Sequence, residues 1–276
     1  MKLLILGGSG MVGHMILNYF RKKKNMEVYF TSRNTQDEGA IFLDAVQIDQ
    51  VRGLIEKLRP DILVNGIGLL NEQAALQLTD AIRLNSLLPH FLAKLADKYG
   101  GKVIHISTDC VFEGTKGGYS EADLPDGSSV YAKTKSLGEV AGGRHLTIRT
   151  SIIGPEKKQN GIGLFHWFMK QSGKIKGYQN VLWNGVTTLE LAKVIDQCIA
   201  QDLSGLYHLT APTKISKYEL LLLIQRVFQK NDVEIMPDGE ISLDRTLIDT
   251  RKELHHTVPD YPEMLSDLYN WMMDND

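Results

Sequence analysis

The chain has 276 residues, of which 43% are hydrophobic and 23% charged, an ordinary composition for a soluble globular protein. This length favours one large α/β domain with a smaller lobe. A net charge of −2 excludes a global attraction to nucleic acid or to an anionic membrane. Two cysteines are too few for a disulfide framework, and no segment is long and apolar enough to span a bilayer. We therefore expect a cytoplasmic protein that binds neither nucleic acid nor membrane.

Short apolar runs alternate with longer amphipathic segments in the first half of the chain, a pattern typical of βαβ units. The runs predicted as strands are residues 2–6, 27–31, 41–43, 61–65, 102–107 and 146–149. The segments predicted as helices are residues 11–24, 47–58, 80–99 and 129–141. Pro89 interrupts the third helix and indicates a kink or a late helix start. Strands joined in this way form a doubly wound parallel sheet of the Rossmann type, with ligands at the carboxyl ends of the strands.

The pattern changes after Gly154. Residues 155–180 are rich in Gly, Lys and Gln and are interpreted as an excursion on the substrate side. Three further helices are predicted: residues 188–200, a helix from the capping box at Ser216 to about Gln229, and one after Pro262. We predict a cofactor-binding domain over residues 1–154, with the 188–200 helix packed against it. Residues 155–276 are predicted to form mainly a substrate-binding lobe.

Three glycines, Gly7, Gly10 and Gly13, connect the first predicted strand to the first predicted helix. Glycine at these positions lets the backbone approach a pyrophosphate closely at a helix N-terminus. An ordinary tight turn is the alternative, but this spacing at the first strand–helix junction favours a dinucleotide loop. The other loop residues expected to contact the cofactor are Ser9, Met11 and Val12.

The second predicted strand ends in Ser32-Arg33, without the acidic residue that would bind a ribose 2′-hydroxyl. Ser32 can donate to a 2′-phosphate and Arg33 can pair with it, so NADPH is favoured, with NADH as the alternative. Arg33 as a solvated loop cation is the other interpretation. Three residues at later strand ends are also expected to meet the cofactor: Asp44 at the adenine edge, and Asn65 and Gly66 near the middle.

Three residues predict the chemistry. Thr108 follows the fifth predicted strand, and Tyr131 and Lys135 lie four residues apart on the next helix, hence on one face. A phenol titrates near pH ~10, and a neighbouring ammonium stabilises the phenolate and makes acid–base work easier. The Thr108 hydroxyl can polarise a substrate carbonyl together with Tyr131, and Lys135 can also bridge the ribose hydroxyls. The pattern predicts hydride transfer between a nicotinamide cofactor and a carbonyl.

The histidines and cysteines do not indicate a metal site. His255 and His256 are adjacent, so they would not share a helical face, and no carboxylate cluster accompanies them. His105 alternates into the fifth strand and is interpreted as a satisfied core residue. Nothing in the sequence predicts a lowered pKa for the Cys110 thiol.

The chain resembles the dTDP-4-dehydrorhamnose reductase family, a branch of the extended short-chain dehydrogenases/reductases. The residues that carry the resemblance are Ser107–Gly114, Tyr119, Glu121, Asp123, Pro125, Tyr131 and Lys135–Glu139. The similarity covers essentially the whole chain and is strongest at 1–13 and 103–150. By this resemblance Thr108, Tyr131 and Lys135 are the catalytic triad. The implied reaction is NADPH-dependent reduction of the 4-keto group of a 4-keto-6-deoxy sugar nucleotide, in the synthesis of surface polysaccharide precursors.

Four residues are predicted on the substrate side: Asp109, Asn85, Trp183 and Arg245. Asn85 resembles the family's supporting asparagine, and Arg245 falls roughly where the family places an arginine near its C-terminal loop. Residues 155–187, which include Lys174 and Lys176, are expected to form a wall with Arg245 that receives the sugar nucleotide.

The sequence departs from the family near the substrate. Cys110 replaces the usual tyrosine, and Ile152-Ile153-Gly154 and the segment from Trp183 to Thr188 also differ. A UDP-linked 4-keto-6-deoxy-N-acetylhexosamine is therefore an alternative substrate. A sugar-nucleotide epimerase is the second enzyme hypothesis. The third is a non-catalytic NADP-binding regulator, because the regulatory β subunit of methionine adenosyltransferase has a similar fold. A homodimer is left open.

Overall fold

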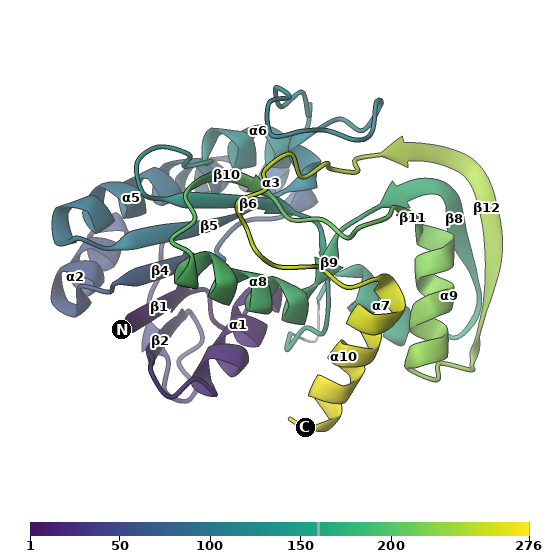
Figure 1. Ribbon diagram of the computed structural model, residues 1–276, viewed down its shortest axis with the longest axis horizontal. Coiled ribbons are helices and arrows are strands. Elements are labelled where there is room, and N and C mark those ends of the chain that lie inside the picture. The colour runs from purple at the N-terminus through teal and green to yellow at the C-terminus, as the bar shows by residue number, and fades with distance from the viewer. Residues whose placement is uncertain (159–160, 276) are drawn as a thin grey trace.

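The computed structural model describes residues 1–158 and 161–275. Within them, seven parallel strands form a central sheet in the order β10-β6-β5-β4-β1-β2-β3 (Figure 1). Its strands are β1 (Lys2–Leu6), β2 (Glu27–Ser32), β3 (Ile41–Phe42), β4 (Ile62–Asn65), β5 (Lys102–Thr108), β6 (Leu146–Thr150) and β10 (Gly205–His208). The predicted doubly wound parallel sheet is confirmed. Strand β10 adds an edge that comes from the second half of the chain.

Helices cover both faces of this sheet. Helices α1 (Met11–Arg21) and α8 (Thr188–Ala200) pack together on one face, and α2 (Ile48–Leu58), α5 (Leu88–Tyr99) and α6 (Val130–Leu137) cover the other. Successive side chains of β1 point to opposite faces of the sheet and join the cores on both sides. Leu3 and Ile5 join the core under α1 and α8, whereas Leu4 and Leu6 join the core under α2 and α5. A strand buried on both faces reads as a continuous apolar run, as this one does.

The single helix predicted over residues 80–99 is several segments in the structure. Helices α3 (Asn71–Leu76) and α4 (Leu78–Ala81) are followed by the π-helical segment η1 (Ile82–Leu87) and then by α5. Pro89 lies in the first turn of α5, directly after the π-helical segment, where the helical hydrogen-bond pattern changes. The π-helical turn before it places the Asn85 side chain between the loop after β4 and helix α6.

The smaller lobe lies beyond the carboxyl ends of the central strands and contains β8 (Gly173–Trp183) between β11 (Ile215–Ser216) and β12 (Val233–Asp244). β12 runs parallel to β8, with a bulge between Asp238 and Ser242. Helices α7 (Leu164–Met169), α9 (Lys217–Val227) and α10 (Tyr261–Met273) complete it, with the short pair β7 (Ile152–Ile153) and β9 (Val186–Thr187). The segment interpreted as an excursion thus contains α7 and much of β8.

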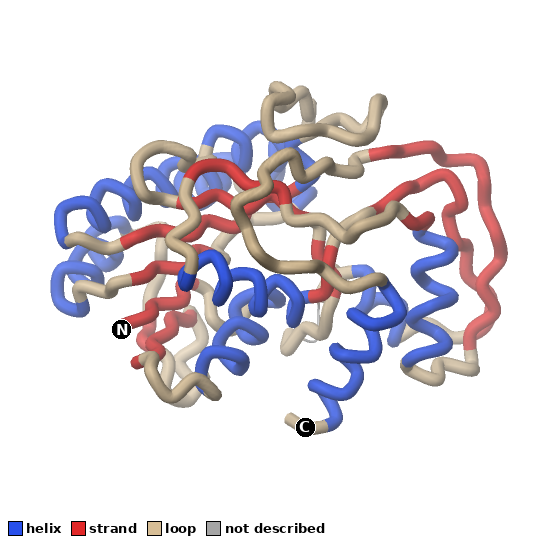
Figure 2. The backbone as a smooth tube through the Cα atoms, viewed as in Figure 1, coloured by secondary structure: helices blue, strands red, loops and turns tan. Residues whose placement is uncertain are grey.

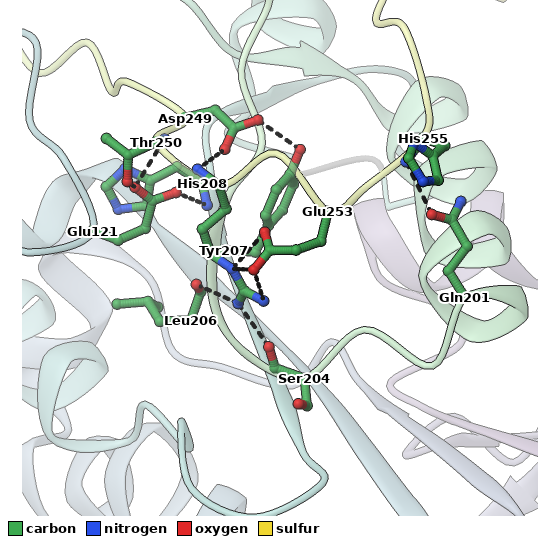
Figure 3. Close-up of polar contacts among 11 residues, drawn as sticks. Glu121, Gln201, Ser204, Leu206, Tyr207, His208, Asp249, Thr250, Glu253 and His255 are labelled. Atoms are coloured by element: carbon green, nitrogen blue, oxygen red, sulfur yellow. Dashed lines mark hydrogen bonds and ion pairs between the residues drawn. The ribbon is translucent and has the colours of Figure 1, made fainter.

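A C-terminal strap, residues 245–260, runs from β12 back across the β10 edge of the sheet to α10 (Figures 1 and 2). Arg251 Nη1 donates to the carbonyl oxygens of Ser204 (2.6 Å) and Leu206 (2.9 Å), and Tyr207 Oη donates to Asp249 (2.9 Å; Figure 3). The two Arg251 bonds occupy carbonyl groups at an edge strand that would otherwise be open to pairing. No helix in the described part of the chain is long and apolar enough to cross a bilayer.

Candidate active site

The glycine loop between β1 and α1 has the geometry of a phosphate cradle. Gly7 has φ +79°, a conformation that side chains rarely adopt, and its carbonyl accepts from Gly10 N at 2.9 Å. A Cβ on Gly13 would lie 2.1 Å from the Gly7 oxygen. No side chain caps the N-terminus of α1, and its first turn holds no acidic residue. The free N–H groups of that turn suit an anionic phosphate.

A cavity of about 630 Å³ lies at the carboxyl ends of β1, β2 and β4. Seven residues predicted to contact the cofactor line it: Gly7, Ser9, Gly10, Ser32, Arg33, Asp44 and Gly66. Asp44 is also held in place, since its Oδ1 accepts from Val46 N at 3.2 Å. Arg33 is exposed and makes no hydrogen bond or ion pair with any described residue, so its guanidinium is available to a ligand.

Ser32 has a partner that the sequence reasoning missed. Its hydroxyl donates to Asp37 Oδ2 at 2.5 Å and lies 3.0 Å from the Ser9 hydroxyl. Asp37 also accepts from Asn34 Nδ2 at 2.9 Å. A carboxylate therefore stands near the place where a 2′-phosphate would enter, five residues beyond the strand end where an acid was sought. Its charge opposes that of Arg33.

The second cavity, of about 330 Å³, adjoins the first along the glycine loop and is lined by Thr108, Tyr131 and Lys135. Thr108 ends β5, and the other two lie one turn apart on α6, whose N-terminus is capped by Ser129. All three are buried. Met11 and Val12 line this cavity as well. The predicted triad thus lies in one cavity that is continuous with the nucleotide cavity.

The ammonium group of Lys135 lies against strand β5 of the central sheet. Its Nζ donates to the Ile106 carbonyl at 2.7 Å and lies 3.3 Å from His105 Nε2. Burial lowers the pKa of Lys135 to about 8, while the carboxylate of Glu139 acts in the opposite direction. Both polar contacts of the ammonium group are with β5, and none is with the phenol of Tyr131.

Tyr131 is a neutral phenol in this environment. Burial raises its pKa, and a hydrogen bond with Thr108 acts in the opposite direction. Burial also raises the pKa of Cys110, which lines the same cavity, to about 12. The phenol can donate a proton at neutral pH, whereas the thiol is not a nucleophile there.

Charged side chains gather on the substrate side of the triad. Asp109 lines the second cavity and accepts from Thr108 Oγ1 at 3.1 Å. Burial raises the pKa of Asp109, and the cations of Lys217 and Arg245 act against this rise. Arg245 Nη1 lies 3.7 Å from Cys110 Sγ. The structure therefore brings Arg245 beside the loop that follows β5, although it lines neither cavity. Lys217, at the start of α9, lies near the same loop and was not predicted from the sequence.

Several residues predicted for the site lie outside both cavities. Asn85 is fully buried. Its Oδ1 accepts from the backbone N–H of Leu69, and its Nδ2 donates to the carbonyl oxygen of Leu69 and, at 3.0 Å, to Thr134 Oγ1. It clamps the loop after β4 to the catalytic helix. Trp183 is buried against Tyr261, with Lys217 Nζ 4.8 Å from its ring centroid.

The other displaced predictions concern Asn65 and two lysines. Asn65 is fully buried at the end of β4 and bonds His105 rather than lining a cavity. Lys174 and Lys176 form exposed ion pairs with β12 acids, Glu234 at 3.5 Å and Asp238 at 2.8 Å. Among the described residues, no group of three or more His, Cys, Asp or Glu side chains could hold a metal ion.

A doubly wound parallel sheet, a glycine cradle and a buried Thr-Tyr-Lys triad define a nicotinamide-dependent oxidoreductase of the short-chain dehydrogenase/reductase class. The chain belongs to the RmlD substrate binding domain family, whose model matches residues 1–242.

Relatives and solved structures are similar to this chain over most of its length. The dTDP-4-dehydrorhamnose reductase of Escherichia coli K12 is 28% identical over 239 residues, which cover 81% of this chain and 77% of that protein. The methionine adenosyltransferase 2 subunit beta of Danio rerio is 24% identical, over 87% and 77%. A dTDP-4-dehydrorhamnose reductase structure from Clostridium acetobutylicum superposes with a TM-score of 0.83 at 24% identity, over 99% of this chain and 100% of that one. One from Bacillus anthracis, solved with NADP, also has a TM-score of 0.83, at 20% identity over 98% and 99%.

Proposed function

We propose that the protein reduces the 4-keto group of a 4-keto-6-deoxy sugar nucleotide with NADPH, in the synthesis of surface polysaccharide precursors. The observation that carries this proposal is the burial of Thr108, Tyr131 and Lys135 in one cavity that adjoins the nucleotide cavity. Membership of the family, and relatives named dTDP-4-dehydrorhamnose reductase, support the substrate class.

The residues of the cavity account for the proton in this reaction. When bound, the nicotinamide cofactor supplies the hydride. Tyr131 donates its proton to the ketone oxygen, and the Thr108 hydroxyl, which now bonds Asp109, can turn to hydrogen bond the same oxygen. A ketone, a hydride and a proton together give the alcohol, so atoms and charge balance.

The cradle and the first cavity support a dinucleotide, and Arg33 supports a phosphate on its ribose. Its unpaired guanidinium lines the cavity wall beside Ser32. Asp37 supports some use of NADH as well, because its carboxylate on the Ser32 hydroxyl can accept from a ribose hydroxyl. We place NADPH first because the guanidinium has no hydrogen bond or ion pair with any residue that the structure describes, whereas the carboxylate already has two hydrogen-bond donors.

For the substrate we propose a site between Asp109, Arg245 and Lys217. A nucleotide diphosphate brings negative charge, and the two cations that act on Asp109 can meet it. We also propose that residues 155–276 form mainly the substrate-binding lobe and residues 1–154 the cofactor-binding domain. Cys110, smaller than tyrosine, leaves room at the sugar, which keeps a UDP-linked 4-keto-6-deoxy-N-acetylhexosamine as an alternative to the dTDP-linked sugar.

Two rival functions remain, and the comparisons give specific support to one of them, the regulator. The methionine adenosyltransferase 2 beta subunits match at comparable identity, which supports a regulator, but the complete triad argues for catalysis. An epimerase would use the same tyrosine and lysine. It would interconvert C4 stereoisomers without net consumption of NADPH.

The deciding experiment offers dTDP- and UDP-linked 4-keto-6-deoxy sugars to the protein with NADPH and follows NADPH oxidation and product stereochemistry. We expect stoichiometric NADPH oxidation with one nucleotide class. Calorimetry of UDP and dTDP with the NADP-loaded protein and with Arg245→Ala separates binding from turnover. If no sugar is reduced and neither nucleotide binds at millimolar concentration, the reductase proposal fails and the regulator hypothesis gains support.

A further inference from the structure

A chain of three buried side chains connects β4 to the catalytic helix. Asn65 Nδ2 lies 3.1 Å from His105 Nδ1, and His105 Nε2 lies 3.3 Å from Lys135 Nζ. Asn65 and His105 are fully buried and face each other in register across β4 and β5. The sequence reasoning interpreted His105 as a satisfied core residue. The structure places it in contact with a catalytic side chain.

The hydrogen bonds around Asn65 determine which nitrogen of His105 carries the proton. Asn65 Oδ1 accepts from Ile67 N at 3.2 Å, so the amide nitrogen is the atom that faces the ring. A donor opposite Nδ1 requires Nδ1 to accept. Burial and the nearby Lys135 charge lower the pKa of His105 well below its usual range, so the ring is neutral and has one N–H. That N–H is on Nε2 and points at Lys135.

This tautomer disfavours a charged lysine. An ammonium has three donors and no acceptor, so it cannot accept the Nε2–H, whereas a neutral amine has a lone pair that can. We propose that Asn65 and His105 are positioning residues that present the Nε2–H to Lys135 and thereby favour its neutral amine form. The geometry leaves the Ile106 carbonyl as acceptor for one remaining Nζ–H.

The other ionisable groups near this pair do not reverse the effect. Glu139 is the carboxylate that favours the charged lysine, but Arg149 binds it through two hydrogen bonds of 2.7 Å, and Ser107 Oγ donates to it at 2.7 Å. On the other side, any positive charge on His90 disfavours a charged His105. Tyr131, one turn away, is a neutral phenol. Burial lowers the pKa of Lys135 to about 8, and the Nε2–H of His105 acts in the same direction.

Reversible loss of the lysine proton has a use in turnover. Each reduction takes one proton from Tyr131, and solvent must restore it. Lys135 does not contact the phenol, so a water between them would take the Nζ proton while it gives one of its own to the Tyr131 oxygen. The amine lone pair then accepts the Nε2–H of His105 until solvent returns a proton to Nζ. This role in turnover rests on the proposed function, whereas the tautomer of His105 does not.

The tautomer is tested on the free protein, without substrate. Long-range ¹H–¹⁵N correlation spectra of histidine-labelled protein distinguish protonated from unprotonated ring nitrogens, and the His105→Gln variant assigns the signals. We expect a protonated Nε2 and an unprotonated Nδ1 at neutral pH. The reverse assignment would overturn the inference, because Nε2 would then accept from an ammonium and stabilise it.

Asn65→Asp changes the tautomer with almost no change of shape, but its added negative charge itself favours the charged lysine, so the uncharged His105→Gln distinguishes the two causes. A carboxylate still accepts from Ile67 N but can only accept from His105, so the ring proton moves to Nδ1 and Nε2 accepts from Lys135. The Lys135 pKa, read from ¹³Cε-lysine titration, and the pH midpoint of kcat should both rise by about one unit. His105→Gln, which can turn its carbonyl oxygen toward Nζ, should shift them in the same direction.

A matched control is His145→Gln, another buried histidine, which accepts from Val103 N on the same strand β5 but does not contact Lys135. It should leave the midpoint at the wild-type value. An unchanged midpoint and lysine titration in folded Asn65→Asp and His105→Gln would contradict the inference even if the enzyme is an active reductase. Loss of reductase activity in the wild type would leave the NMR result standing and would count against the proposed function alone.

Discussion

The nucleotide end of the site is shaped by backbone, whereas the reacting end is shaped by buried side chains. At the nucleotide end, Gly7 and Gly13 make room for a ligand, and the specific groups, such as Arg33, are exposed and free. At the reacting end, Tyr131 and Lys135 are buried and their pKa values are shifted. We therefore expect substitutions at the nucleotide end to act through the room that they leave for the ligand, and substitutions at the reacting end to act through the charge that they add or remove.

The largest effect is expected at the reacting end, from Tyr131→Phe. The ring keeps its contacts with Ala74 and Ala81, but the proton donor is lost. We expect kcat to fall by about 10²–10⁴-fold, the usual worth of a general acid. NADPH affinity should stay close to wild type, because the cradle is untouched. Steady-state kinetics and calorimetry check both values, and a variant that kept most of its activity would refute the assignment of Tyr131.

Lys135→Met tests the cost of a buried charge. The pKa of Lys135 is lowered in the folded state from 10.5 to about 8, so between these values the unfolded chain binds more protons than the folded one. Wild-type stability should therefore gain on the order of 2–3 kcal/mol from this group as pH rises from about 8 to about 10.5. Below pH 8 the full penalty is present.

The Lys135→Met variant lacks this pH-dependent contribution to the free energy of unfolding. Urea unfolding of the two apo-proteins at pH 7 and pH 10.5 should show the variant most favoured at pH 7, with a difference that shifts toward the wild type at the higher pH. A difference that is independent of pH would mean that Lys135 titrates normally in the folded protein. Turnover and cofactor affinity of the variant should both be weakened.

How far the sequence could predict these two ends depends on how local the signals are. The cradle and the Tyr131–Lys135 pair lie within single strand–loop–helix units, so spacing alone predicted them. In the smaller lobe, by contrast, the strands that pair are far apart in the sequence. β8 and β12 pair in parallel although about fifty residues separate them, and several β8 side chains are exposed, so no continuous apolar run marked the strand.

The same reason explains the site residues that sequence reasoning missed or misplaced. Lys217 reaches Asp109 only because α9 packs against β8, and Asp37 reaches Ser32 through a loop of no regular pattern. Asn85 was expected near the substrate, but the π-helical turn before Pro89 directs it to Leu69 and Thr134. For His105 the sequence did hold one indication. Side chains alternate between the two faces of β5, so His105 lies on the same face as Ser107.

At the nucleotide end, Arg33→Ala should weaken NADPH binding by ~1.5–3 kcal/mol, the worth of a charge-assisted hydrogen bond, with little effect on NADH. Asp37→Asn is the companion variant. Because Asp37 holds a negative charge beside Ser32, neutralising it should favour NADPH and weaken NADH. Calorimetric titration with both cofactors measures the four affinities. Equal losses of NADPH and NADH in Arg33→Ala would show that the guanidinium does not bind the 2′-phosphate.

The smallest effects come from a matched pair of glycines. In Gly13→Ala the new methyl would lie 2.1 Å from the Gly7 carbonyl oxygen, so the loop must move. We expect a cost of ~1–3 kcal/mol in stability, as for overpacking elsewhere, together with weaker binding of either cofactor. In Gly53→Ala, within α2, the methyl would meet nothing within 4 Å. This helix should gain ~0.5–1 kcal/mol, because alanine is the better helix former. Thermal unfolding with and without NADPH separates the two. If Gly13→Ala bound both cofactors like wild type, close approach of the backbone would not be what the nucleotide end requires, and the contrast with the reacting end would fail at that point.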